Sequence, residues 1–302
     1  MALQSSGQIS ISDLQTEFSG TSGSLKAYSE AAGKTEPHGL SEFYSYAFTR
    51  TNTYYYTNDG VNDYIKGTWS GQTSLHNNDW SVSFWVRQNQ TSASSQQLWD
   101  FNANSTLNSG NTTNRVFLQY VGASNRLLIR IRTSGVNFDK QWTLHDNSSV
   151  TGITSSAGWT SSQRGFTNID DMCMITITYD SSQSLAVDAF KLYWNDAEVT
   201  SSVSTANGAR SAATFASLCL CAAQHNISGG NANVDIDEWA FYNDVLTSTE
   251  VATLYNNGVS QSADTLHTNN LSEAISFASS NSLDTYASNY SGTITGGSTV
   301  AY

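Results

Sequence analysis

Short runs in which apolar and polar residues alternate are the most regular feature of this chain. Residues 80–87 place Val82, Phe84 and Val86 on one face, which is the two-residue period of a strand. Similar runs occupy 115–120, 126–132, 172–179, 189–195, 216–222 and 234–242. Turn-forming asparagine–glycine, aspartate–glycine and glycine–glycine pairs lie between them. Many short strands without long amphipathic helices predict an all-β fold of two packed sheets.

One helical pattern follows these strands. Val251, Leu254 and Tyr255 have the i, i+3, i+4 spacing of a helix face, and either Thr247 or Ser248 can cap its first turn. The helix is expected to end at Asn257-Gly258, and it closes the strand region.

The first 50 residues carry a different pattern. An apolar residue, a serine, an acid and a second apolar residue occur in succession twice, from Ile11 to Leu14 and from Leu40 to Phe43, and Phe18 follows the first of them. Each repeat predicts a capped helical turn. Such turns cannot bury a core alone, so we expect these five apolar residues to dock on the main domain, a symmetry mate or another structure.

These patterns divide the chain into an assembly arm (1–50), a sandwich (51–260) and a C-terminal extension (261–302). Within the extension, apolar residues between 266 and 277 predict one weak helix, and residues 293–302 predict a strand. This is too little for an independent domain. We therefore expect the extension to pack on the sandwich or on a neighbouring subunit.

The charge pattern argues against nucleic-acid binding. The chain has 13 basic and 25 acidic residues, for a net charge of −12. Its densest basic spot is only Arg126, Arg130 and Arg132, which is no stripe along which a polyanion could be held.

The cysteines and the N-terminus predict synthesis in a reducing cytoplasm. Cys173, Cys219 and Cys221 cannot all pair, and no nearby cysteine or histidine completes a zinc site, so we interpret them as reduced core residues. Residues 1–10 lack a secretory signal, and no apolar run is long enough to insert into a membrane.

Several strand phrases resemble those of laminin-G-like domains in the concanavalin A-like superfamily. They are DGVNDYI at 59–65, WSVSFWV at 80–86, ITITYD at 175–180, KLYWND at 191–196 and VDIDEWAFY at 234–242. They occur in the order of the family and cover about two-thirds of the chain. The resemblance implies an all-β, concanavalin A-like jelly-roll sandwich, here with a short, partly helical N-terminal arm and a small C-terminal extension.

Residues 9–18, with the echo at 40–43, resemble the opening segment of structural proteins from tailed phages, particularly marine and cyanobacterial ones. This resemblance implies a virion protein, assembled in a bacterial cytoplasm and attached to other virion proteins through its arm. The sandwich would act in a tail fibre or capsid fibre that adheres to host-surface glycans, or as a capsid decoration protein that cements the particle. A homo-oligomer is expected for fibre-like proteins, although no heptad or collagen repeat marks one.

Aromatic residues in polar contexts are the candidates for sugar stacking. Tyr55, Trp69, Trp142 and Trp159 lie among polar, loop-like neighbours and could form a binding surface. The alternative is that they cover sheet edges or form subunit contacts.

Aspartates near predicted turns are the candidates for a metal site. Asp59, Asp63 and Asp79, together with Asn77 and Asn78, supply the hard oxygen ligands that Ca²⁺ prefers, and related domains bind this ion on loops. Aspartate is also an ordinary turn former, and the chain has no fixed-spacing calcium loop. Calcium is therefore a candidate ligand rather than a required cofactor.

Acidic residues at 235–238 raise the alternative of a glycoside hydrolase. Asp235 and Asp237 share one face of a strand, at a spacing that a retaining carboxylate pair could bridge. Glu238 faces the other side, and Asn233 stands where a further acid would be needed. The family resemblance implies a structural role for these acids, so we predict a binding protein and no enzyme.

Overall fold

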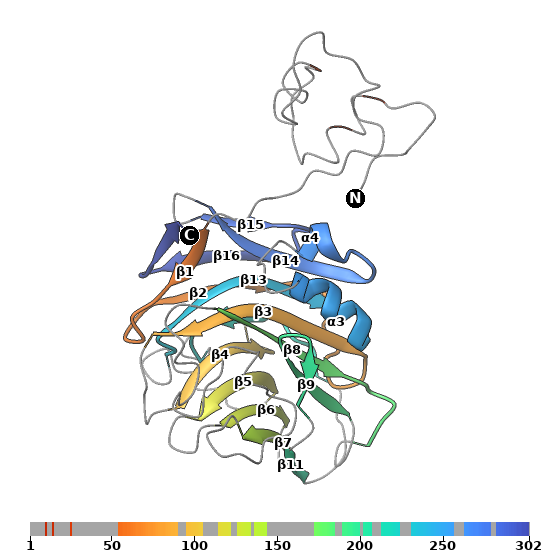
Figure 1. Ribbon diagram of the computed structural model, residues 1–302. Coiled ribbons are helices and arrows are strands. Elements are labelled where there is room, and N and C mark those ends of the chain that lie inside the picture. Colours follow the sequence, from red (N-terminus) through yellow and green to blue (C-terminus); the bar gives the residue numbers. More distant parts are fainter. Residues whose placement is uncertain are drawn as a thin grey trace.

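The computed structural model describes most of the chain after residue 53. The described residues are 54–89, 95–104, 114–121, 126–133, 136–143, 172–184, 189–199, 202–206, 213–223, 231–256, 263–278 and 282–301, with Ser10, Leu14 and Leu25. They form two antiparallel sheets packed face to face, with two short helices at one side (Figure 1).

Sheet A contains nine of the described strands, in the order β10-β9-β8-β3-β13-β1-β17, with β14 also paired to β13 and β15 paired to β14. Their bounds are β1 (Tyr54–Thr57), β3 (Trp80–Gln88), β8 (Cys173–Tyr179), β9 (Phe190–Trp194), β10 (Ala197–Glu198), β13 (Val234–Tyr242), β14 (Leu271–Ala278), β15 (Ser282–Thr285) and β17 (Ser298–Ala301).

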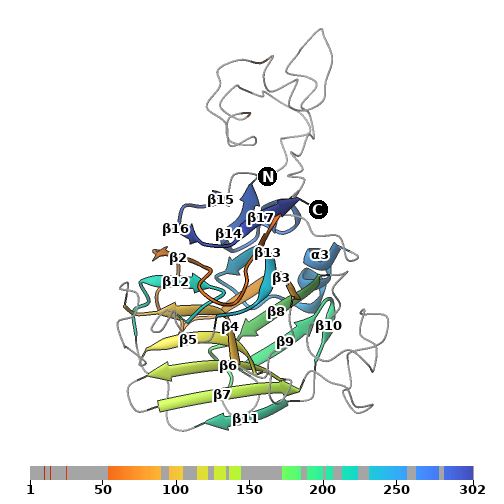
Figure 2. The same cartoon turned by 90° about the vertical axis from the view of Figure 1, so that its left-hand side faces the viewer.

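Sheet B contains eight of the described strands, in the order β11-β7-β6-β5-β4-β12-β2-β16. Their bounds are β2 (Tyr64–Trp69), β4 (Ser95–Asn102), β5 (Arg115–Val121), β6 (Arg126–Thr133), β7 (Val136–Thr143), β11 (Ser202–Ala206), β12 (Ser217–Leu220) and β16 (Tyr290–Thr295). Figure 2 shows β4, β5, β6, β7 and β11 following one another down this sheet.

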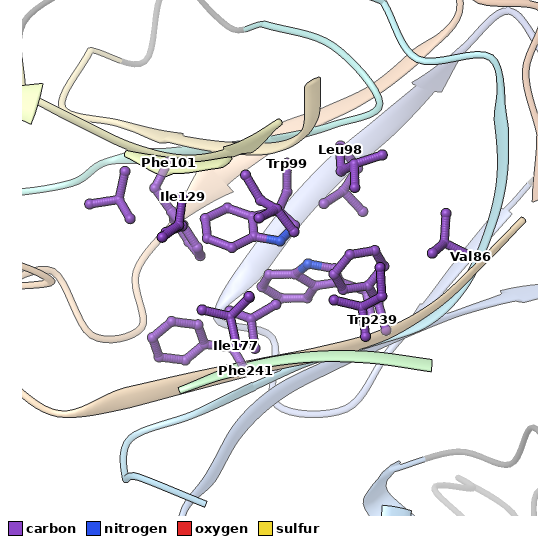
Figure 3. Close-up of a cluster of buried hydrophobic side chains, with 14 of the residues drawn as sticks. Val86, Leu98, Trp99, Phe101, Ile129, Ile177, Trp239 and Phe241 are labelled. Atoms are coloured by element: carbon purple, nitrogen blue, oxygen red, sulfur yellow. The ribbon is translucent and has the colours of Figure 1, made fainter. Parts of the chain in front are cut away.

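The core lies between the two sheets and is rich in aromatic rings. Trp99 and Phe101 of sheet B meet Trp239 and Phe241 of sheet A (Figure 3). The rings of Phe101 and Phe241 lie 5.6 Å apart in an edge-to-face arrangement, a favourable geometry for aromatic pairs. Alternation in β3 supplies this core as the sequence predicts, because its apolar face at 82, 84 and 86 is fully buried.

A second apolar cluster covers part of the outer face of sheet A. Trp85, on the other face of β3, packs there with Met174 and Tyr193, beneath Val251 and Leu254 of α3 (Ser248–Tyr255). The outer face of β3 is therefore partly buried as well.

The cap of α3 is Thr247, which settles the choice left by the sequence. Its hydroxyl accepts from the Glu250 N–H (3.3 Å), and the Glu250 carboxylate accepts from the Thr247 N–H (2.7 Å). This reciprocal capping box confirms the predicted helix.

Residues after 262 are part of both sheets, so the sandwich continues past the predicted boundary at 260. The predicted helix between 266 and 277 is wrong: α4 (Ala263–Leu266) is a single turn, and β14 follows it. Ile275 and Phe277 both reach the core, and residues two apart share a face only in a strand. β16 then joins sheet B beside β2, while β17 joins sheet A beside β1.

Of the five arm residues singled out by the sequence, Leu14 is described. It is helical and buried, and its N–H donates to the Ser10 carbonyl oxygen (3.2 Å). Ile11, Phe18, Leu40 and Phe43 lie outside the described residues.

Cys173, Cys219 and Cys221 are buried and unbridged, as expected from their apolar surroundings. No helix in the described part of the chain is both long and apolar enough to cross a membrane.

Candidate functional site

A polar cleft lies at one end of the sandwich, where β2 and β13 end and β3, β14 and β16 begin. It is open to solvent and has a volume of about 720 Å³. Its lining residues come from five separate segments of the chain and are Ser70, Gly71, Gln72, Asn77, Asn78, Asp79, Ser181, Asn243, Ser272 and Asn289.

Trp69 anchors the first of these segments from below. Its indole N–H donates to the Gln72 carbonyl oxygen (2.9 Å), which fixes the turn after β2. Gly71 lies directly on the indole: a Cβ at this position would come within 2.5 Å of Trp69 Cζ2. The close approach therefore requires glycine at position 71.

The loop between β2 and β3 is held by its own polar side chains. The Gln72 amide donates to the Asp79 carbonyl oxygen (2.7 Å), and the Asp79 carboxylate accepts from the Ser181 N–H (2.7 Å). Asn77 and Asn78 both donate their backbone N–H to the Ser74 carbonyl oxygen (3.1 and 3.2 Å). This turn leaves both asparagine side chains exposed at the cleft.

The opposite wall is held by a fully buried carboxylate, Glu273 of β14. It accepts from the N–H groups of Ala287 and Tyr290 (both 2.9 Å), and so fixes the loop between β15 and β16. Within that loop, the Asn289 amide donates to the Ser272 carbonyl oxygen (2.6 Å). The wall is therefore set before any ligand arrives.

The cleft offers amides, hydroxyls and one carboxylate. An amide both donates and accepts hydrogen bonds, which matches the alternating hydroxyls of a sugar or another polyol. The lining given above contains no basic side chain and no aromatic ring. Asp79 is its sole carboxylate, so this lining lacks the acid pair that glycoside hydrolysis requires.

Two of the four aromatic residues predicted to bind sugar are in the core. Trp69 is 3% exposed and Trp142 is 1% exposed. The prediction that they lie in exposed loops is wrong, because both belong to strands of sheet B and face the space between the sheets. Buried rings cannot stack on a sugar. Trp69 still contributes to the cleft, as the support beneath its floor.

The other two aromatic residues predicted to bind sugar, Tyr55 and Trp159, do not line the cleft as described. Tyr55 is half-buried on β1, where its hydroxyl accepts from Arg87 (3.2 Å) and its ring lies 5.2 Å from the Arg87 guanidinium carbon. It lies outside the lining of the cleft. Trp159 lies outside the described residues.

The three predicted calcium ligands serve backbone groups. Asp63 accepts from the Asp59 N–H (3.0 Å) and Asp59 accepts from the Val61 N–H (2.8 Å), so both order the loop between β1 and β2. Asp79 belongs to the cleft instead. No group of three or more His, Cys, Asp or Glu residues in the described part of the chain could hold a metal ion. Calcium binding stays a prediction.

The acids of β13 are buried within sheet A. Asp235 accepts from Arg87 Nε (2.8 Å) and from the Asn89 amide (2.6 Å). Asp237 accepts from the Glu238 N–H (2.9 Å) beside a β-bulge, where Glu238 has a positive φ of 45°. These contacts favour the structural interpretation of the acidic phrase.

Sequence reasoning missed most of the cleft. Asn77 and Asn78 appeared there only as supplementary oxygen ligands beside Asp79, and Gln72, Asn243 and Asn289 were not singled out. The sequence pattern that could have indicated them is an amide residue next to the end of several predicted strands. One sequence alone does not show that these strand ends lie together in the fold.

Comparisons with known proteins show similarity in fold but not in sequence. No protein-family model matches it, and neither does any curated protein. A solved structure titled "putative carbohydrate binding protein", from Bacteroides ovatus, is similar with a TM-score of 0.50 at 12% identity; the match covers 85% of this chain and 61% of that one.

Two further solved structures are similar at lower scores. A heptameric SAP-like pentraxin from Limulus polyphemus has a TM-score of 0.43 at 11% identity, covering 78% of this chain and 95% of that one. The CBM40 of the Ruminococcus gnavus IT-sialidase has a TM-score of 0.41 at 10% identity, covering 66% and 100%. With the two-sheet topology, the Bacteroides match confirms the predicted all-β jelly-roll sandwich.

Proposed function

We propose that this protein is a non-catalytic glycan-binding sandwich whose end cleft takes neutral sugar residues. The observation that carries the proposal is the lining of the cleft: amides and hydroxyls from five chain segments, three of them exposed asparagines, converge on one hollow of about 720 Å³. Ligand sites are concave and use a few placed polar groups to orient the ligand. In this cleft, amides and hydroxyls also take the place of the apolar and aromatic side chains that usually line such sites.

The ligand is neutral because the cleft has no cation to offer. Its lining contains one carboxylate and no lysine, arginine or histidine. The net charge of −12 also repels acidic polymers at long range. Uncharged hydroxyls avoid both penalties and match the amide groups.

The fold supports the same class of function. The Bacteroides protein, which shares the sandwich, is named for carbohydrate binding. Fold alone does not assign function, so this similarity adds to the argument from the cleft without replacing it.

We further propose that the sandwich is displayed on a phage particle, in a tail fibre or capsid fibre, with residues 1–50 as the anchor and several copies per fibre. This part rests on the resemblance of residues 9–18 to virion structural proteins. The cleft would then bind host-surface glycans after assembly in the bacterial cytoplasm.

A glycan array with the purified protein tests the binding proposal. We expect retention on neutral oligosaccharides, and loss on the double variant Asn78→Ala/Asn243→Ala. Each neutral hydrogen bond contributes about 0.5–1.5 kcal/mol, so the pair should lower the affinity roughly 5- to 150-fold. Asn62→Ala is the matched control, because this exposed asparagine lies just before the start of β2, at the other end of that strand from the cleft.

The outcomes separate the alternatives. If the wild-type protein binds no neutral glycan, or if the double variant binds as well as wild type, the cleft proposal is wrong. A parallel pull-down against empty phage heads and tails tests the anchor. Binding to particles but to no glycan would identify a capsid decoration protein.

A further inference from the structure

A second hollow lies on the outer face of sheet A, beside the first turn of α3. It encloses about 670 Å³. Its floor includes apolar groups from Ala189, Tyr193 and Leu246, and its rim carries Asp180 and Lys191. It therefore differs from the end cleft, whose walls are polar throughout.

The two hollows share a wall. Ser181 lines the end cleft while Asp180, its neighbour in the chain, lines the second hollow. On the β13 side, Asn243 lines the cleft and Val245 lines the second hollow. Residues 180–181 and residues 243–245 thus each line both hollows.

Hydrogen bonds that are buried or partly buried fix this shared wall. The Ser81 hydroxyl donates to the Asp244 carbonyl oxygen (2.7 Å) and accepts from the Leu246 N–H (3.0 Å). On the other side, the Asp79 carboxylate holds the Ser181 N–H. The two hollows therefore keep a constant separation.

That separation is within reach of one oligosaccharide. The chain runs from Asn243 in the cleft to Ser248 in the second hollow, and such a segment spans at most about 17 Å when fully extended. A glycan of several rings can lie across it, whereas a monosaccharide fills only one hollow.

The chemistry of the two hollows is complementary for such a chain. Hydroxyl edges of one ring suit the amides of the cleft, and the apolar C–H face of a later ring suits the floor formed by Ala189 and Leu246. Lys191 and Glu198 form an ion pair at the rim (3.4 Å), so the second hollow presents no unopposed cation to an acidic sugar.

We propose that the two hollows form one groove that binds a linear neutral glycan of several residues, so that polymer chains bind more tightly than mono- or disaccharides, which occupy only one hollow. The inference rests on the proposed glycan binding and extends it to the class of glycan.

Titration calorimetry with neutral gluco-, manno- and galacto-oligosaccharides, from disaccharides to octasaccharides, tests the groove. We expect the affinity of the wild-type protein to rise at least tenfold with length, until both hollows are filled. Ser248→Trp places a large ring in the second hollow and should abolish this gain while leaving the binding of short oligosaccharides unchanged.

Two further variants serve as controls. Ala252→Trp adds the same ring to an exposed position of α3 outside both hollows, and should bind as wild type. Lys191→Ala removes a rim group without adding bulk, and should lower the affinity for long oligosaccharides several-fold. It keeps the test valid should Ser248→Trp perturb the helix.

The possible failures are distinguishable. If short oligosaccharides bind but length adds nothing, or if neither Ser248→Trp nor Lys191→Ala affects long ones, the groove is refuted while the cleft stands. If the wild-type protein binds no oligosaccharide of any length, the proposed function falls and the groove with it.

Discussion

The end cleft and the outer face of sheet B both gather polar side chains. Those of sheet B bond to one another, whereas those of the cleft border an open hollow. On β5, Arg115 and Phe117 point away from the core that Val116 and Leu118 enter. Arg115 donates to both carboxylate oxygens of Asp100 (2.7–3.2 Å), and both residues are at most 2% exposed. In the cleft, asparagine amides face an open hollow.

This difference separates structural polar groups from functional ones. A buried ion pair leaves no hydrogen-bonding group for a ligand. In the cleft, the Gln72 and Asn289 amides already donate to protein carbonyls, whereas the exposed Asn77 and Asn78 side chains line the hollow and are accessible to a ligand. Two of the three basic residues of β6 also bond within the sheet: Arg126 donates to Gln141 (3.1 Å), and the part-buried Arg130 pairs with Asp139 (2.5 Å). Most of the densest basic spot in the sequence is thus engaged within the sheet.

The largest effect on stability is expected from Arg115→Met, which removes one partner of the buried ion pair. Removing one partner leaves the Asp100 carboxylate buried and unpaired, so we expect a loss of about 3–5 kcal/mol in the free energy of unfolding. Urea denaturation followed by tryptophan fluorescence measures it. The double variant Asp100→Leu/Arg115→Met should recover much of the loss. A single-variant loss below about 1 kcal/mol would contradict the assignment.

Glu273→Gln should have the next largest effect, because this buried carboxylate supports the cleft. The substitution removes the charge that strengthens its bonds to the Ala287 and Tyr290 N–H groups, so we expect a loss of about 1.5–3 kcal/mol in unfolding free energy. Glycan affinity should fall too, since Asn289 lies in the loop that these bonds hold. Asp196→Asn, at an exposed position between β9 and β10 and outside both hollows, is the matched control and should change neither quantity.

Glu250 should give a smaller, pH-dependent effect. The backbone N–H of Thr247 lowers the pKa of this carboxyl below its ordinary value, mainly by hydrogen bonding to the ionised form. The stabilisation is therefore fully present above the ordinary glutamate pKa and is lost as the pH falls through the lowered value. We expect wild type to exceed Glu250→Gln in stability by less than about 1 kcal/mol at neutral pH. The gap should close in acid; a gap that is constant between pH 7 and pH 3 would refute the mechanism.

The smallest effect should come from the cleft itself. Asn78→Ala and Asn243→Ala should each change the unfolding free energy by no more than about 0.5 kcal/mol, because these exposed amides carry little of the fold. Differential scanning calorimetry is the readout. A large loss of stability would place them with the structural group and remove them as ligand-binding residues.

Local patterns predicted much of the fold. The alternation in β3, the aromatic phrase of β13 and the cap of α3 all appear where the sequence indicates, because each depends on neighbours in the chain. β14 was mistaken for a helix because Leu271 and Ile275 are spaced four apart, as on a helix face. Its strand state follows from pairing with β13, which a local window does not contain.

The site was harder to predict for the same reason. Polar neighbours around Trp69 and Trp142 indicated exposed loops, yet both rings lie in the core because strands alternate faces. The cleft combines residues 70–79, 181, 243, 272 and 289, and only the sheet topology brings them together.

The pairing of β1 with β17 and of β2 with β16 also determines the order in which parts of the sandwich can fold during synthesis. Tyr54 pairs with Ala301, so β1 must wait for a partner made much later in translation. At the usual speed of a ribosome the delay is on the order of tens of seconds. Until β12 and β13 are made, neither β1 nor β2 has a strand partner. After that, β1 has only a short pairing with β13, β2 lacks its neighbour β16, and the loop carrying Asn289 is still to come. Nascent chains therefore expose unpaired strand edges for most of their synthesis, and they acquire the cleft among the last steps of maturation.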